Sequence, residues 1–248
     1  MIVAALVLGA VVGSFLNVVI LRLPKGQSLV RPASHCGSCG KPIRWFDNIP
    51  VLSFLWLRAR CRQCGARISW RYPVVEATTA LLFALAAGHL GWGLELIGAW
   101  LLLAVLVVIA AIDLEHQVIP DSISLPVIAA GLALSFVTPS RSWIDSLLGI
   151  AVGGGIPFAI IVLSRGGMGG GDMRLGALIG AFLGWQLAVL SLFMAVLLGG
   201  VAATALLIAG RKGRKDRIPF GPFLAWSGAM SLFWGDALLR WYWSGFAP

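Results

Sequence analysis

The chain has 248 residues, of which 59% are hydrophobic and 12% charged, and its formal net charge is +9. Soluble domains have roughly 45–50% apolar and about 25% charged residues, so this composition excludes an ordinary soluble protein. Long apolar runs with few charges indicate a polytopic helical membrane protein in a lipid bilayer. The basic residues cluster between the apolar runs, as membrane topology requires, and we therefore expect no nucleic-acid partner.

The first predicted elements are a membrane span and a polar insert. Residues 1–22 predict the first transmembrane helix, and residues 23–72 predict a separate polar domain. Ten of the nineteen basic residues lie in the stretch 22–72. Basic residues accumulate in cytoplasmic loops, so we expect the insert on the cytoplasmic side of a cell (inner) membrane.

The remaining residues, 73–248, predict a transmembrane core. The run 73–112 is too long for one crossing and has a polar break at 89–96, which indicates two helices. Further spans are expected at 122–137 and 146–163, two within 173–209, and a last one at 218–242. The chain is therefore predicted to be an all-α polytopic membrane protein with about eight transmembrane helices and a small cytoplasmic insert between the first two.

All four cysteines lie in the insert, as the pairs Cys36/Cys39 and Cys61/Cys64. Two Cys-x-x-Cys loops are typical of a tetrahedral Zn²⁺ site, because each loop aims two thiolates at one ion. Disulfides and a redox pair are the alternatives, but a cytoplasmic location disfavours disulfides and a redox motif needs no second copy. Four cysteines leave no open position for water, so we expect a structural role for the zinc.

Two carboxylates interrupt the apolar core. Asp113 closes the apolar run 101–112, and Asp172 follows the glycine-rich stretch 166–171. Ionisable groups at membrane depth are costly and mark candidate functional sites. Asp172 could also cap the helix that follows it, and capping is the expected role of Asp121. Asp113 is expected at a helix C-terminus, where the helix dipole disfavours a negative charge, so we interpret it as functional.

If the chain is a hydrolase, a pair of aspartates is a better candidate for its catalytic groups than any other residues in the sequence. The sequence has no His-Glu-x-x-His motif for a metalloprotease, and the three histidines suit no serine–histidine pair. In a pair of aspartates, one ionised carboxylate takes a proton from water while the other, protonated, polarises the scissile carbonyl. A transporter or metal-sensing protein that uses the acids as an ion path is the rival interpretation.

Several segments in this order resemble the type IV prepilin leader peptidases, a family of GxGD membrane aspartyl proteases. The four segments that carry the resemblance are 13–24 (GSFLNVVILRLP), the cysteine insert with 71–76 (RYPVVE), 113–121 (DLEHQVIPD) and 169–172 (GGGD). The resemblance covers nearly the whole chain. Two departures are Glu115, where the family often has Asp, and Arg174, where it commonly has Lys.

The resemblance implies two activities on the cytoplasmic side of the membrane. One cleaves the leader of prepilins or pseudopilins after a glycine, with Asp113 and Asp172 as the catalytic pair, in type IV pilus or type II secretion systems. The other methylates the new N-terminus with S-adenosylmethionine. A peptidase without methyl transfer remains an alternative.

The methyl-transfer site is sought among polar residues at the membrane edge of the insert. Asn17, Arg22 and Glu76 are the candidates for binding S-adenosylmethionine, since no glycine-rich dinucleotide motif is present. An ion pair between Arg22 and Glu76 is an equally good interpretation, because buried charges usually pair.

Overall fold

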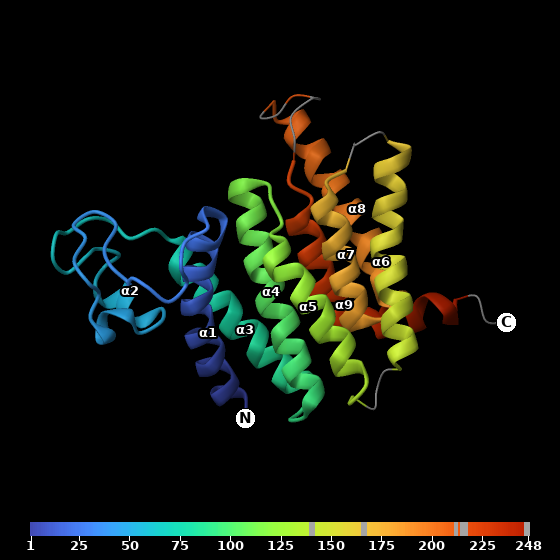
Figure 1. Ribbon diagram of the computed structural model, residues 1–248, viewed down its shortest axis with the longest axis horizontal. Coiled ribbons are helices and arrows are strands. Elements are labelled where there is room, and N and C mark those ends of the chain that lie inside the picture. The colour runs from blue at the N-terminus through green and yellow to red at the C-terminus, as the bar shows by residue number, and fades with distance from the viewer. Residues whose placement is uncertain (139–141, 165–167, 211–212, 214–217, 246–248) are drawn as a thin grey trace. The chain divides into compact units, whose positions relative to one another are not determined.

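The computed structural model describes residues 1–138, 142–164, 168–210, 213 and 218–245 (Figure 1). Within these ranges every regular element is a helix, and only two isolated β-bridges occur. The predicted all-α fold is therefore confirmed. The basic cluster at 211–217 lies almost entirely outside the described residues.

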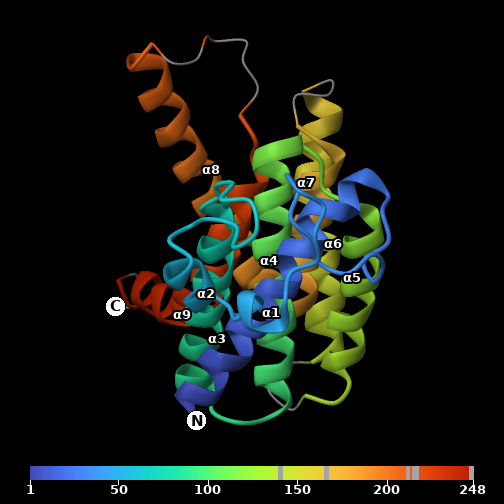
Figure 2. The ribbon, with the colours of Figure 1, turned by 90° about the vertical axis from the view of Figure 1, so that its left-hand side faces the viewer.

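The chain forms two compact units, Met1–Trp92 and Gly93–Pro248. The helices of the first unit are α1 (Ile2–Arg22), η1 (Leu23–Lys25), η2 (Trp45–Asn48), α2 (Leu52–Trp56) and α3 (Arg71–Leu90). Helices α1 and α3 pack against each other (Figure 2). A Cβ added to Gly9 would lie 2.7 Å from Cα of Ala80, and one on Gly13 would lie 2.8 Å from Cα of Glu76. Glycine thus allows the two helix backbones to approach closely.

The second unit is a bundle of six helices within the described residues. These are α4 (Leu94–His116), α5 (Asp121–Ser135), α6 (Trp143–Leu163), α7 (Gly170–Leu183), α8 (Trp185–Ile208) and α9 (Gly221–Ser244). Helix α7 contacts every other helix of this unit. Its residues 175–181 are all buried, so α7 is the central element of the unit.

The structure groups α3 with α1 and the insert, whereas the sequence suggested three segments, 1–22, 23–72 and 73–248. The difference follows from the close packing of α1 on α3, which joins two helices that are separated in sequence by the insert.

Five described helices are long and apolar enough to cross a membrane, and they confirm a multi-pass membrane protein. They are Ile2–Lys25, Arg71–Leu90, Leu94–His116, Trp143–Leu163 and Trp185–Ile208. Helix α7 has 14 residues, which corresponds to about 21 Å and is shorter than a hydrocarbon core of about 30 Å. The count of eight spans therefore stays a prediction.

Helix α4 is longer than the sequence suggested. The predicted span ended at Ile112, but α4 continues to His116 and stops at Gln117, which adopts φ 53°. The segment 113–116 contains no Gly or Pro, so nothing in it breaks the helix. Asp113 therefore lies within the last turn of α4.

Helices α6 and α7 meet through two reciprocal glycine pairs. A Cβ added to Gly149 would overlap the carbonyl of Gly180, and one added to Gly180 would overlap that of Gly149. Gly153 and Gly176 form the same reciprocal arrangement four residues away. Gly176 and Gly180 thus allow α7 to pack closely on α6.

We expect Gly149→Ala to destabilise the protein by about 1–3 kcal/mol, because the new methyl group meets a backbone atom that cannot rotate away. Gly155→Ala on the same helix is the matched control, since a Cβ there meets nothing within 4 Å. Thermal unfolding in detergent checks this expectation. Equal melting temperatures for the two variants would contradict it.

Candidate functional site

The structure brings Asp113 and Asp172 together in the second unit. Asp113 lies in the last turn of α4 and Asp172 in the first turn of α7, and these two helices are in contact. Both residues are buried, with 6% and 9% of their surface exposed. The two carboxylates are close enough to interact electrostatically. Two acids far apart in the sequence thus form one site.

Asp113 is held by the start of α9. The backbone N–H of Gly221, the first residue of α9, donates a hydrogen bond to Oδ2 of Asp113 at 2.9 Å. A Cβ on Gly221 would lie 2.6 Å from this oxygen, so a side chain at this position would displace the carboxylate. The positive end of the α9 dipole also faces the carboxylate and offsets the unfavourable C-terminal end of α4.

Gly221 was missed in the sequence analysis. The signal that could have found it is its position between Pro219 and Pro222, because proline favours the first turn of a helix. Such a pattern indicates a helix N-terminus, whose free amides bind anionic groups.

Asp172 is the third residue of α7, whose N-cap is Gly169. Its carboxylate accepts a hydrogen bond from the backbone N–H of Gly169, and its own N–H donates to the Gly169 carbonyl at 3.1 Å. This is the return bond of a capping box, so the helix-capping interpretation and the acid pair are both compatible with the geometry. The stretch 165–167 before it lies outside the described residues.

Gly171 brings this turn close to the link between α4 and α5. A Cβ on Gly171 would lie 2.9 Å from Cβ of the buried Ile119. Gly171 therefore serves close packing of the α7 N-terminus.

The expected capping role of Asp121 is wrong. The N-cap of α5 is Pro120, and Asp121 instead forms an ion pair with Arg174 of α7. The pair links the N-terminal parts of α5 and α7, since Arg174 lies only two residues beyond Asp172. Glu115 does not share the face of Asp113. Its side chain is 40% exposed and lies 4.0 Å from Nε2 of His116.

The four cysteines form a compact cluster in the insert. Their sulfur atoms all lie within 4.8 Å of one another, and all four cysteines are free. The Sγ atoms of Cys36 and Cys64 are 3.8 Å apart, which is too long for a disulfide of about 2.05 Å. It matches the edge of a tetrahedron around zinc, about 3.8 Å for Zn–S bonds of about 2.3 Å. The set can therefore hold a metal ion.

The two cysteine loops share one backbone geometry. Gly40 N–H donates to the Cys36 carbonyl, and Gly65 N–H donates to the Cys61 carbonyl, both at 2.9 Å. Gly40 and Gly65 have φ values of 67° and 71°, which suit glycine. Glycine therefore suits the tight turn at the end of each cysteine loop.

The electrostatics of the cluster also suit a cation. The backbone amides of Cys39 and Ser38 lower the pKa of the Cys36 thiol to about 6. At Cys64 the Ala66 amide lowers the thiol pKa, but desolvation and the three neighbouring sulfurs outweigh it and raise the pKa to about 11. Four thiolates at this spacing repel one another, and a divalent cation would remove that repulsion.

Asn17, Arg22 and Glu76 all belong to the first unit, and each has its own hydrogen-bond partners. Arg22 donates to the carbonyls of Ser28 and Pro32 at 3.0 and 2.7 Å, so it braces the start of the insert. Glu76 instead accepts a hydrogen bond from Val51 N–H at 2.7 Å. The alternative of an ion pair between Arg22 and Glu76 is therefore wrong.

Asn17 is the most deeply buried of the three, with 2% exposed. Its Nδ2 donates to the carbonyls of Gly13 and Tyr72, at 3.3 and 3.1 Å. Its Oδ1 has no hydrogen-bond partner among the described residues. A buried acceptor without a donor is unusual and is available to a ligand.

Both units match known protein families. Residues 7–90 match the bacterial peptidase A24 N-terminal domain, and residues 100–204 match the type IV leader peptidase family. No solved structure matches the chain significantly.

Three relatives share the name prepilin leader peptidase/N-methyltransferase. The Myxococcus xanthus (strain DK1622) protein is 46% identical over 214 residues, covering 84% of this chain and 64% of the relative. The Aeromonas hydrophila protein is 37% identical over 264 residues, covering 95% and 91%. The Bacillus subtilis (strain 168) protein is 34% identical over 236 residues, covering 95% of each chain. The chain spans just under two thirds of the Myxococcus relative and nearly all of the other two, and it belongs to the type IV leader peptidase family.

Proposed function

We propose that this protein is a membrane aspartic endopeptidase that removes the leader from prepilins or pseudopilins and then methylates the new N-terminus. Asp113 and Asp172 form the catalytic pair. The observation that carries the proposal is the meeting of these two buried carboxylates at adjoining helix ends. The names of the relatives support both activities. An ion path would need acids spread through the bilayer, which this single cluster does not supply.

The proposed cleavage uses both acids at once. One carboxylate is ionised and takes a proton from water, and the water oxygen attacks the scissile carbonyl carbon. The other is protonated and donates to the carbonyl oxygen, so the tetrahedral intermediate forms without a buried oxyanion. Collapse of this intermediate breaks the C–N bond: the departing amine takes up the proton that the first carboxylate removed from water, and the second carboxylate takes back its proton from the hydroxyl of the intermediate. The Gly221 N–H already donates to Oδ2 of Asp113, so Oδ1 is the oxygen of this carboxylate that is available to accept a hydrogen bond from the water.

The membrane setting suits a pilin-like substrate. We place the acid pair on the cytoplasmic side of the inner membrane, because the basic insert and the acid pair are predicted to share that side. A precursor with an apolar helix after its leader could reach the pair laterally from the bilayer.

The methyl-transfer site is proposed in the first unit. S-adenosylmethionine carries an ammonium group and a sulfonium, and two buried acceptors, Glu76 and Oδ1 of Asn17, fit such positive charge. When bound, the cofactor supplies an electrophilic methyl group to a free amine. Arg22 would affect cofactor binding only indirectly, because its guanidinium is hydrogen-bonded to the backbone of the insert.

We propose that the four cysteines bind one Zn²⁺. Their thiolates complete a tetrahedral coordination shell, so the ion is structural. Only three short helical segments, η1, η2 and α2, occur between α1 and α3, and their one buried residue is Phe54. A metal ion would supply stability that this small core lacks.

Asp113→Asn and Asp172→Asn are each expected to lower leader cleavage by at least about 10²–10⁴-fold, the usual contribution of a general acid or base. Purified enzyme is incubated with a precursor and labelled S-adenosylmethionine, so that cleavage and methylation are read together. Each variant should also fail to label the precursor but should label a pre-cleaved substrate. Asp236→Asn, an exposed carboxylate farther along α9, is the control. Full cleavage by either variant would refute the catalytic pair.

Gly221→Ala is expected to reduce the kcat of cleavage strongly, because the methyl group would displace Oδ2 of Asp113. Gly170→Ala is the matched control, since a Cβ at this first residue of α7 meets nothing within 4 Å. Rates are compared at saturating precursor after unfolding temperatures have shown that both variants are folded. Equal rates would show that the Gly221 contact is dispensable.

Cys61→Ser is expected to abolish zinc binding and to make the insert sensitive to protease, because three thiolates hold the ion less tightly. Elemental analysis should give one zinc per chain for the unchanged protein. His35→Ala should retain the metal, since its Nδ1 lies 3.0 Å from the Ala33 carbonyl and four cysteines already complete the shell. Clean protein without zinc would rule out the metal site.

A further inference from the structure

Helix α2 in the insert presents an apolar face that no described residue covers. Leu52, Leu55 and Trp56 are all exposed, Trp56 at 84%. Their spacing of i, i+3 and i+4 places them on one side of the helix. Phe54 points the other way, is buried, and packs on Trp70 with ring centroids 4.8 Å apart. The helix therefore has one face fixed in the insert and one apolar face turned outward.

The backbone on both sides of α2 is strained. Val51 before the helix has φ 61°, and Arg58 and Ala59 after it have φ 49° and 58°. Leu52 N–H donates to the Pro50 carbonyl at 2.6 Å, which closes a tight turn around Val51. Positive φ is a genuine outlier for a β-branched residue and costs about 1–3 kcal/mol.

Glu76 of α3 holds this strained turn in place through its 2.7 Å hydrogen bond to Val51 N–H. The orientation of α2, with its apolar face turned outward, is therefore fixed by specific contacts. Strain of this kind persists where the surrounding structure needs it, so the exposed face calls for a functional explanation.

The position of α2 along α1 indicates what lies against this face. Figures 1 and 2 show α2 at a level between the two ends of α1, so the insert folds back beside that helix. Helix α1 is long and apolar enough to span a bilayer. A side chain at this level and pointing away from the protein meets lipid headgroups or acyl chains rather than bulk water.

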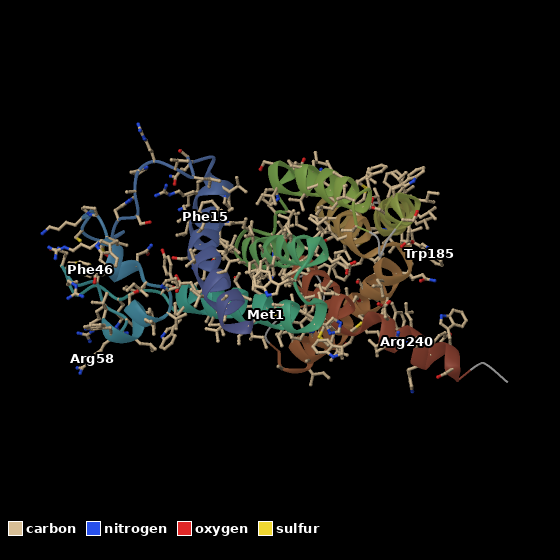
Figure 3. All side chains as sticks on the ribbon, turned by 90° about the horizontal axis from the view of Figure 1, so that it is seen from below. Met1, Phe15, Phe46, Arg58, Trp185 and Arg240 are labelled. Carbon is tan, nitrogen blue, oxygen red and sulfur yellow. The ribbon has the colours of Figure 1, made fainter. Side chains whose placement is uncertain are left out.

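The charge of the insert specifies the type of lipid. Asp47 is the only acid in residues 23–72, and it is already paired with Arg62 at 2.7 Å. Arg58 and Arg60 follow α2 directly, and Figure 3 shows Arg58 at the outer margin of the insert. Arginine beside tryptophan and leucine is the pattern of an interfacial segment that binds anionic headgroups.

We propose that α2 is an interfacial anchor: Leu52, Leu55 and Trp56 enter the headgroup–acyl boundary of the adjacent leaflet, and Arg58 and Arg60 bind anionic lipid phosphates. The anchor holds the insert against the membrane surface. This inference concerns the lipid contact of the insert and does not depend on the peptidase or methyltransferase activity.

The test uses the full-length protein in nanodiscs of phosphatidylcholine and phosphatidylglycerol, with or without brominated acyl chains. Emission of the unchanged protein minus that of Trp56→Phe isolates the Trp56 signal from the other ten tryptophans. Brominated chains should quench most of this signal, whereas iodide in the water should quench little. Quenching by iodide alone would place the face in water, and quenching by neither would place it against protein. Both outcomes overturn the proposal.

The anionic component is tested in the same discs. Omitting phosphatidylglycerol should weaken the quenching by brominated chains, and Arg58→Gln with Arg60→Gln should remove that dependence. Quenching that is equal with and without phosphatidylglycerol would overturn the assignment to anionic lipid. Trp45→Phe is the matched control, because Trp45 is exposed to a similar degree in the same insert but outside α2. Unchanged zinc content in every variant would show that the insert remains folded.

Discussion

This protein depends on one constraint: helix backbones must approach one another closely, and backbone amides must approach the buried carboxylates. Lipid supplies no hydrophobic force that drives one apolar helix onto another, so packing in a membrane relies on small residues at the contacts. Gly149 and Gly153 meet Gly180 and Gly176 in this way. Helix α7 is thereby fixed in the middle of its unit, and Asp172 is fixed with it.

The same constraint shapes the surroundings of the acid pair. A buried carboxylate is costly unless hydrogen bonds compensate for the lost water. Asp113 obtains this compensation from the amide of Gly221, and Asp172 from the amide of Gly169. Both amides belong to helix N-termini, whose free N–H groups and dipoles favour negative charge. The site is therefore assembled from helix ends.

The insert is organised by different forces. With Phe54 as the only buried residue of its helical segments, it depends on two cysteine loops, whose sulfur atoms can hold a metal ion, and on backbone contacts to neighbouring spans. Arg22 at the end of α1 braces its first residues, and Glu76 in α3 holds the strained turn at Val51. The polar residues at the membrane edge therefore have structural tasks in addition to any role in cofactor binding, and the insert is coupled to both helices that flank it.

Much of this organisation is readable from the sequence, because apolar length, glycine breaks and cysteine spacing are local properties. They determined the all-α membrane fold, the order of the helices, the cysteine cluster and the two aspartates as candidates. The sequence misplaced the end of α4, because no residue type marks Gln117 as a helix stop. It also assigned a capping role to Asp121, because local patterns do not show that Arg174 lies across a helix contact.

Only the tertiary structure decided which distant groups meet. The contact between Gly221 and Asp113 joins residues 108 positions apart, and the turn that Glu76 clamps lies 25 residues before it. Such contacts depend on how helices pack in three dimensions, and that packing is set by many small residues acting together. The sequence by itself determined the chemical groups that this protein possesses, and the packing of its helices decided which of them act as one site.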